Sequence, residues 1–481
     1  MSTPTQSKKN SKIKSARWRF RPDEQRTILI LGDLFIALLA FYSALYIWGT
    51  LPDEWLNFSM DFLKQRVQLW FYFLPLIWLL LMIDLYDVRI ANNWVSTLRG
   101  IFITSLASII LYSFIYLLSP KGSLPRIGVG IFLINASVLS IIWRWIYIKI
   151  FTAPSAIRRV AIMGAGVTGN TLAQAYNKMA VKPFLLVGFI DDDPIKANTL
   201  IEDLPVLNTS ENLLETINKY DISEMVIAIS GQMSGETFQE ILDAQERGLE
   251  ISQMPSTYEE LLGRVPIHHL EADWIIRSFV DEARVSKFYE LGKRALDMVG
   301  GFVGTLIFLL FYPLIALLIF LDSGFPITYV QTRSGKGGKP YQMLKFRTMY
   351  QDAEKDGKVQ LTQENDTRIT KIGNILRKTH IDELPQFLNV LQGVMSLVGP
   401  RSERPAWISE FQKQIPFYRA RLQVKPGITG WAQVNYSYYA TVEEMAIKLE
   451  YDLYYLKHRN LFMDLIILLR TVGQVLHFRG R

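Results

Sequence analysis

An adjacent pair of carboxylates, Asp382 and Glu383, is the feature of this sequence best suited to chemistry. Pro385 follows closely, and proline is tolerated only in the first turn of a helix, so the pair is expected at the start of a helix running to about Leu391. Free N–H groups at a helix start favour a bound phosphate and an ionised carboxylate. An ionised aspartate can attack phosphorus, and its neighbour can help to hold Mg²⁺. By itself, such a pair is an ordinary helix cap.

Cationic residues surround the pair in the sequence and favour the phosphate interpretation. Guanidinium groups bind phosphate oxygens in pairs, and ammonium groups bind them as point charges. The candidates are Arg333, Lys345, Arg347, Arg377, Arg401, Arg404 and Lys425. His380 is interpreted either as a proton shuttle or as a hydrogen-bond donor beside the pair. Residues 334–339 read SGKGGK, which lacks the spacing of a nucleoside triphosphate loop and is typical of a hairpin turn.

A second chemical motif lies in the middle of the chain. Gly164, Gly166 and Gly169 follow a predicted strand and open a predicted helix, and Asp191 ends the next strand. This is the context of a dinucleotide site, where glycines let the backbone approach a diphosphate and the carboxylate binds a ribose. Strands and helices alternate through 151–280, so we expect a Rossmann-like domain there. Nucleotide binding and a structural or regulatory relic both stay open.

The elements before this domain are apolar. After a basic cytoplasmic tail, 1–26, the region 27–150 is expected to hold four transmembrane helices, because each apolar stretch approaches the ~20 residues that cross a bilayer. These stretches are 27–49, 67–83, 100–118 and 127–148. Asp33 lies within the first stretch, where we expect a structural partner on a neighbouring helix rather than a proton relay. Four crossings would return the chain to the cytoplasm.

Composition supports a membrane protein. Of 481 residues, 49% are hydrophobic, which is high for a soluble chain. The formal net charge of +7 suits anionic headgroups or phosphate substrates, and it equally suits the positive loops of any membrane protein. The chain has no cysteine, which excludes disulfides, zinc–thiolate sites and thiol nucleophiles. The polar, basic N-terminal stretch does not have the pattern of a cleaved signal peptide.

A long apolar run at 293–321 precedes the carboxylate pair. A straight helix of this length could cross a bilayer, but Pro313 interrupts it and both flanks are basic. The positive-inside rule then places both ends on the cytoplasmic side, which predicts a re-entrant helix broken at Pro313. The stretch 461–478 is apolar but interrupted by charges, which is typical of an interfacial amphipathic helix.

Residues 286–481 resemble the bacterial sugar transferase family of monotopic phosphoglycosyl transferases. The matching motifs are Lys293-Arg294-x-x-Asp297, Gln331-x-Arg333-x-Gly335, Lys345-Phe346-Arg347-Thr348-Met349, Asp382-Glu383-Leu384-Pro385-Gln386, Met395-Ser396-Leu397-Val398-Gly399-Pro400-Arg401 and Pro426-Gly427-Ile428-Thr429-Gly430. With the predicted membrane helices and Rossmann-like domain that precede these residues, the whole chain resembles the large form of the family. That form includes undecaprenyl-phosphate glucose or galactose phosphotransferases, which initiate exopolysaccharide, capsule or O-antigen synthesis.

The resemblance implies a reaction and roles for residues. A hexose-1-phosphate passes from a UDP-sugar to undecaprenyl phosphate with release of UMP, by a ping-pong route through an aspartyl-phosphosugar. Asp382 matches the nucleophile, Glu383 its partner, and the two together would hold Mg²⁺. The phosphate- or donor-binding candidates are Arg333, Lys345, Arg347, Arg377 and Arg401. The family commonly has proline where this chain has Ser402, and often has serine where it has Tyr312.

The implied architecture is a membrane protein with α and α/β parts. It has four transmembrane helices, a Rossmann-like domain, and a monotopic catalytic domain over 281–481 with the re-entrant helix and interfacial amphipathic helices. We expect it in the bacterial inner membrane with the catalytic domain on the cytoplasmic face. Its expected partners are the lipid bilayer, a UDP-sugar and undecaprenyl phosphate, and no nucleic acid. Homo-oligomerisation stays open, and no residue distinguishes glucose from galactose.

Two other functions fit parts of the sequence. A membrane-tethered nucleotide-sugar dehydratase or epimerase would need a Tyr-x-x-x-Lys pair within the Rossmann-like domain. The pairs Tyr289/Lys293 and Tyr341/Lys345 have this spacing but lie outside that domain. The second alternative is a non-catalytic assembly or regulatory protein, and the retained carboxylates and arginines argue against it.

Overall fold

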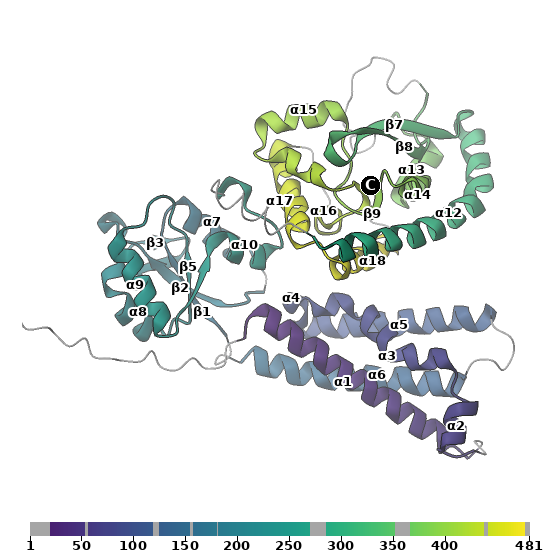
Figure 1. Cartoon of the computed structure of the whole chain (residues 1–481), viewed down its shortest axis with the longest axis horizontal. Coiled ribbons are helices and arrows are strands. Elements are labelled where there is room, and N and C mark those ends of the chain that lie inside the picture. The colour runs from purple at the N-terminus through teal and green to yellow at the C-terminus, as the bar shows by residue number, and fades with distance from the viewer. Residues whose placement is uncertain are drawn as a thin grey trace, which may run out of the picture. The chain divides into compact units, whose positions relative to one another are not determined.

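The computed structural model describes residues 20–52, 56–118, 125–153, 157–179, 181–269, 285–351, 366–436 and 441–476. Most of the predicted basic tail lies outside these residues. The chain divides into two compact units, Met1–Thr257 and Tyr258–Arg481 (Figure 1). The first unit holds apolar helices and an α/β domain, and the second holds the carboxylate pair.

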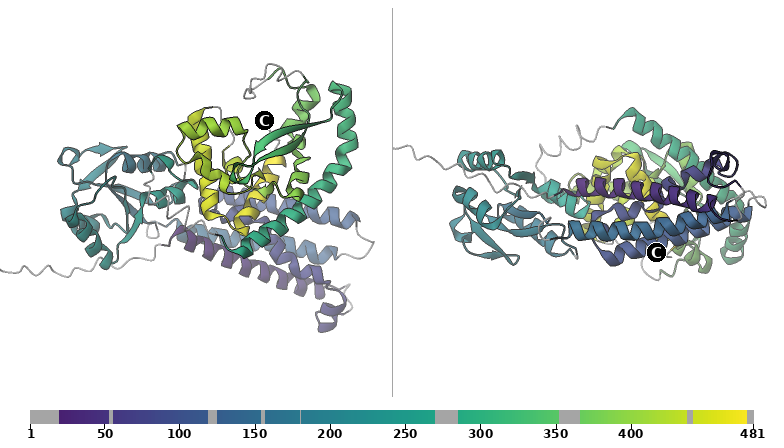
Figure 2. Two further views of the ribbon diagram at one scale, coloured as in Figure 1. Left: turned by 45° about the horizontal axis from the view of Figure 1, so that its top comes forward. Right: turned by 90° about the horizontal axis from the view of Figure 1, so that it is seen from below.

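Three long apolar helices of the first unit could each span a membrane. They are α1 (Pro22–Gly49), α5 (Trp94–Leu118) and α6 (Arg126–Phe151). Helices α1 and α6 lie side by side in each view (Figure 2). Between them Arg144 Nη2 donates to Asp33 Oδ2 at 2.6 Å, and both side chains are fully buried. The structural partner predicted for Asp33 is therefore Arg144.

The second predicted span, 67–83, is not one continuous helix. The structure divides it into η1 (Leu69–Phe73), α3 (Leu74–Leu81) and the start of η2 (Ile83–Tyr86). Pro75 lies in the first turn of α3 and cannot donate the N–H that would continue a preceding α-helix. The apolar stretch Leu69–Leu81 is shorter than a membrane span. Our expectation of a single spanning helix here was wrong.

The α/β domain is built on one six-stranded sheet in the order β3-β4-β2-β1-β5-β6. All neighbouring strands pair in parallel except β3 with β4. The strands are β1 (Arg159–Met163), β2 (Leu185–Ile190), β3 (Leu200–Ile201), β4 (Leu204–Asn208), β5 (Glu224–Ile227) and β6 (Glu250–Gln253). The helices between them are α7 (Val167–Asn177), α8 (Leu213–Tyr220) and α9 (Gly235–Glu246), and α10 (Met254–Leu262) follows β6. This parallel order confirms the predicted Rossmann-like domain.

The second unit begins its polar domain with the long helix α12 (Lys287–Ser323), which contains Pro313. The helix changes direction along its length (Figure 1). Glycines allow close packing in its first half, where a Cβ on Gly304 would lie 2.3 Å from the Phe387 ring. Its second half packs Ile315 and Ile319 into a core that includes Leu376. Both halves of α12 therefore pack against the same polar domain.

The polar domain consists mostly of short elements around a second apolar core, separate from the one that the second half of α12 joins. Its strands are β7 (Thr328–Ser334), β8 (Pro340–Phe346), β9 (Ser396–Val398) and β10 (Gly427–Thr429). Its helices are α13 (Lys371–Lys378), η8 (Ile381–Glu383), α14 (Gln386–Gln392), α15 (Pro405–Gln414), η9 (Tyr418–Gln423), α16 (Trp431–Asn435), α17 (Val442–His458) and α18 (Leu461–Leu476). Strands β7 and β8 form an antiparallel hairpin, and positive φ at Gly337 and Gly338 confirms the predicted turn.

Helix α18 coincides with the predicted amphipathic segment, but one of its charges points inward. Asp464 is fully buried and accepts a hydrogen bond from Lys293 Nζ of α12 at 3.0 Å. The Tyr455 hydroxyl donates to the same carboxylate at 2.8 Å. The charge that interrupts the apolar stretch therefore joins α18 to α12 and is not exposed.

Candidate active site

Asp382 and Glu383 lie in η8, a single 3-10 turn between α13 and α14. His380, which is exposed, precedes η8 with a φ of 57°, and this left-handed residue lets the chain turn sharply out of α13. Ile381 and Leu384 pack into the core beneath α12 and fix the turn from both ends. The pair therefore lies one turn before α14, close to its predicted position. Both carboxylates are buried, with 7% and 8% of each residue exposed.

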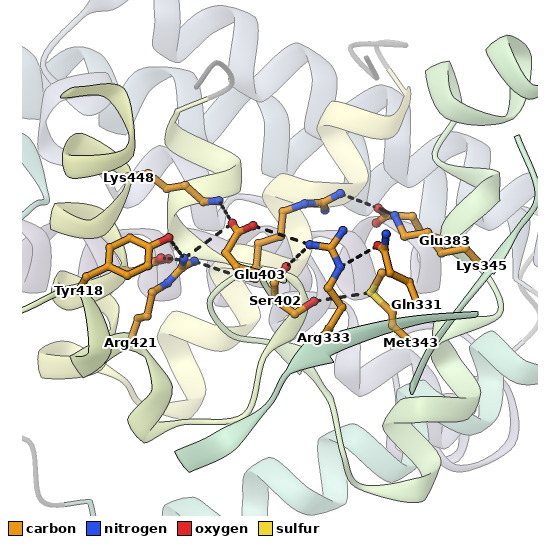
Figure 3. Close-up of polar contacts among 12 residues, drawn as sticks. Gln331, Arg333, Met343, Lys345, Glu383, Ser402, Glu403, Tyr418, Arg421 and Lys448 are labelled. Carbon is orange, nitrogen blue, oxygen red and sulfur yellow. Dashed lines mark hydrogen bonds and ion pairs between the residues drawn. The ribbon is translucent and has the colours of Figure 1, made fainter. Parts of the chain in front are cut away.

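Two cations converge on one oxygen of Glu383. Lys345 Nζ from the end of β8 lies 2.8 Å from Glu383 Oε1, and Arg401 Nη2 lies 2.9 Å from the same atom (Figure 3). Asp382 is less closely paired, because its Oδ2 lies 3.9 Å from Lys345 Nζ. Three separate segments of the chain thus meet at the pair.

The two carboxylates have different electrostatic environments. Burial alone would raise the pKa of Glu383, but the charges of Arg401 and Lys345 outweigh it and hold that pKa well below its usual range. Burial raises the pKa of Asp382 above its ordinary value, and Lys345 opposes the rise only in part. Glu383 is therefore held as an ion-paired carboxylate, whereas Asp382 is the less strongly bound of the two.

The other predicted cations are distributed unevenly around the pair. Arg377 Nε donates to Thr348 Oγ1 at 2.9 Å, and its charge acts on Asp382. Arg347 instead donates to the Gly324 carbonyl and to Ser323 Oγ, at the C-terminal end of α12.

Arg333 is also directed elsewhere. It donates to Gln331 Oε1 at 2.8 Å and to the Ser402 carbonyl at 3.2 Å. The structure therefore brings Lys345, Arg377 and Arg401 to the carboxylates, and it places Arg333 and Arg347 in other contacts.

A buried ionic cluster beside the pair was missed from the sequence. Glu403 lies between Lys448, Arg421 and Arg333 (Figure 3). Arg421 also forms a 2.8 Å ion pair with Asp452. These residues come from distant segments, and the sequence signal that could have found the cluster is Glu403 itself, a charge two residues after the motif that ends in Arg401.

The glycine motif of the first unit has the backbone predicted for it. Gly164 has a φ of 106°, and a Cβ on Gly169 would lie 2.0 Å from the Gly164 carbonyl oxygen, so both positions need glycine. Gly166 is the N-cap of α7. The Asp191 carboxylate, predicted to bind a ribose, accepts from the Ala165 N–H at 2.6 Å. In this structure Asp191 therefore stabilises the glycine loop, and its ligand role stays a prediction.

Comparison with known proteins decides the family. Residues 288–478 match the model of the bacterial sugar transferase family, and residues 81–244 match that of a CoA-binding domain. The UDP-glucose:undecaprenyl-phosphate glucose-1-phosphate transferase of Caulobacter vibrioides is 45% identical over 190 residues, which cover 39% of this chain and 70% of the relative. The chain belongs to the bacterial sugar transferase family.

Two further relatives are similar to part of this sugar transferase. The UDP-N-acetylgalactosamine-undecaprenyl-phosphate N-acetylgalactosaminephosphotransferase of Aeromonas hydrophila is 40% identical over 218 residues, covering 45% of this chain and 50% of the relative. The UDP-glucose:undecaprenyl-phosphate glucose-1-phosphate transferase of Escherichia coli K12 is 45% identical over 185 residues, covering 37% of this chain and 39% of the relative. The sugar transferase thus spans half or less of the length of these two relatives.

Proposed function

We propose that this sugar transferase moves a hexose-1-phosphate from a UDP-sugar to undecaprenyl phosphate, as the first membrane step of exopolysaccharide, capsule or O-antigen synthesis. The observation that carries the proposal is the unequal carboxylate pair, in which two cations hold Glu383 and leave Asp382 less closely bound. The relatives named above act on undecaprenyl phosphate and a UDP-sugar, which supports the same partners here.

The proposed chemistry has two displacement steps at phosphorus. An Asp382 oxygen attacks the β-phosphorus of the donor, the bond from that phosphorus to the bridging oxygen breaks, and the electron pair leaves with UMP. An oxygen of undecaprenyl phosphate then attacks the aspartyl-phosphosugar and returns the Asp382 carboxylate. Lys345 and Arg401 balance the negative charge that gathers around the pair in both steps.

The carboxylate pair fits Mg²⁺ in one specific way. Within the described residues, no group of three or more His, Cys, Asp or Glu could hold a metal. Mg²⁺ is commonly bound by one or two carboxylates together with substrate phosphates, so Asp382 and Glu383 would hold it with the donor. When bound, the ion would neutralise charge on the diphosphate. Chelation with EDTA should abolish turnover, and added Mg²⁺ should restore it.

The packing of α12 supports a re-entrant membrane helix. Its first half packs against Phe387 through Gly304, and its second half packs Ile315 and Ile319 against the same domain. A helix that continued across the bilayer would leave that domain after its break at Pro313. We propose that the catalytic domain lies on the cytoplasmic face of the inner membrane, where a water-soluble donor and a lipid phosphate could both reach Asp382.

The decisive experiment identifies the released nucleotide. Purified full-length protein is incubated with undecaprenyl phosphate and, separately, UDP-glucose, UDP-galactose or UDP-N-acetylgalactosamine. The proposed reaction releases UMP, an ordinary glycosyltransferase releases UDP, and a dehydratase releases no free nucleotide. Asp382→Asn should abolish turnover while the protein still folds. Donor labelled in its sugar should tag the wild-type protein when acceptor is absent, and failure to trap this adduct would contradict the covalent route.

A further inference from the structure

The loop that carries Arg401 is held by hydrogen bonds that its backbone carbonyl groups accept. The Arg401 carbonyl accepts from Arg421 Nη2 at 2.9 Å, and the Ser402 carbonyl accepts from Arg333 Nη1 at 3.2 Å. The next carbonyl, at Glu403, accepts from the last N–H of β7 at 2.9 Å. Three successive carbonyls outside any helix or strand are thus fixed, two of them by guanidinium groups.

Glu403 forms ion pairs with both of these guanidinium groups. Its Oε2 lies 3.7 Å from Arg333 Nη1, and its Oε1 lies 3.7 Å from Arg421 Nη1 and 2.7 Å from Lys448 Nζ. Burial alone would raise the pKa of Glu403, but Lys448, Arg421 and Arg333 outweigh it and bring the pKa to about 2. The carboxylate is therefore charged at neutral pH, and Figure 3 shows it at the centre of the three cations.

The Arg401 side chain leaves this fixed loop and reaches Glu383. It is 33% exposed, so packing alone does not fix its long side chain. A flexible side chain loses rotamer freedom when it is held in one position, and a rigid backbone beneath it lessens the number of arrangements it can adopt. The position of the Arg401 guanidinium on Glu383 therefore depends on the loop, and the loop depends on Glu403.

We propose that Glu403 is a positioning residue for the sugar transferase reaction, which acts through Arg333 and Arg421 on the loop and so sets the Arg401 guanidinium against Glu383. This inference rests on the proposed function, because its test reads turnover. A purely structural Glu403 would stabilise the fold without any special dependence on the Arg401 side chain, and this difference can be measured.

The test is a double-mutant cycle on full-length protein, with UMP release and melting temperature both measured. We expect Glu403→Gln to lower kcat by about 10-fold or more, since small misplacements near reacting groups are costly. Arg401→Lys removes the guanidinium that Glu403 positions. Adding Glu403→Gln to Arg401→Lys should then change kcat by less than about threefold.

If the losses in kcat caused by Glu403→Gln and Arg401→Lys instead multiplied in the double variant, the proposal would be overturned. The proposed function would be left intact by that result. A wild-type protein that released no UMP from any UDP-sugar would overturn both. If Glu403→Gln does not fold, Arg421→Lys serves in its place, because it keeps the charge beside Glu403 and Asp452 but shortens the donor to the Arg401 carbonyl.

The matched control is Glu450→Gln on α17, the helix that also carries Lys448. Glu450 is buried and paired with Arg264 at 3.3 Å, away from the Arg401 loop. Its effect on kcat should be the same in the wild-type and Arg401→Lys backgrounds. If the effect of Glu450→Gln on kcat also depended on the Arg401 side chain, the cycle would be measuring a general effect of packing. The inference would then fail.

Discussion

Lys345 places its ammonium group 2.8 Å from the Glu383 carboxylate, across the gap between the end of β8 and η8. Lys345→Met should lower kcat by about 100-fold, because the variant loses a positive charge that lies within 4 Å of both carboxylates. UMP release measures the effect. The matched control is Lys339→Met, an exposed lysine in the turn of the same hairpin. Equal losses in the two variants would show that the position of Lys345 does not matter.

The buried Asp33–Arg144 pair joins α1 to α6 within the apolar bundle. Arg144→Met should lower stability by about 3–5 kcal/mol, because it leaves a buried carboxylate without its partner. Asp33→Leu combined with Arg144→Met should recover much of this loss. Melting of the detergent-solubilised protein measures both. A double variant less stable than either single one would contradict this account.

Gly304 allows α12 to approach Phe387 of α14. Gly304→Ala should destabilise the protein by about 1–3 kcal/mol, because its new methyl group would overlap the ring. UMP release should fall as well, since α14 directly follows the carboxylate turn. The matched control is Gly473→Ala in α18, where a Cβ would meet nothing within 4 Å and helix propensity predicts a small gain. If Gly304→Ala changed neither stability nor UMP release, α12 and α14 would be able to move apart and accommodate the methyl group.

Glu450 should make stability fall as the pH rises. Burial raises its pKa from 4.5 to about 7, and Arg264 opposes the rise only in part. The folded protein therefore holds this proton more tightly, so the contribution is complete below about pH 4.5 and is lost as pH rises through about 7. Glu450→Gln should gain about 3 kcal/mol relative to the wild type between pH 4.5 and 8.

Melting temperatures of both proteins across this range test the Glu450 prediction. Glu443→Gln, at an exposed position on the same helix, is the control for replacing a glutamate by glutamine there. A constant difference between Glu450→Gln and the wild type would show that this carboxyl does not titrate in the window.

Features set by local pattern were predicted well from the sequence. The glycine spacing around Gly164 placed the parallel α/β domain, and Pro385 placed the carboxylates next to the start of a helix. The glycines of 334–339 predicted the hairpin turn. In each case, one residue type with restricted or unusual backbone freedom dictates the structure within a few positions.

Features that depend on distant partners could not be predicted. Glu403 pairs with Lys448, which lies 45 positions away in the sequence, and no local pattern near either residue predicts this contact. Asp191 bonds Ala165 because the loops after two neighbouring strands meet at one sheet edge, which spacing alone does not give. Arg347 was predicted as a phosphate- or donor-binding residue, yet its side chain donates to groups at the end of α12. Tertiary packing decides how each of these charges is used.

In the proposed re-entrant arrangement, Arg347 would connect the membrane-inserted helix α12 to the segment that carries Lys345. It holds the carbonyl of Gly324 just beyond the end of α12, and it follows Lys345 by two residues in the same segment. A change in the depth of α12 in the bilayer, caused by longer or shorter lipid chains, would move Arg347. It would thereby displace Lys345, whose ammonium group contacts Glu383. If the proposed function and membrane placement hold, turnover should therefore depend on bilayer thickness, and lipid chain length would affect the rate of the reaction.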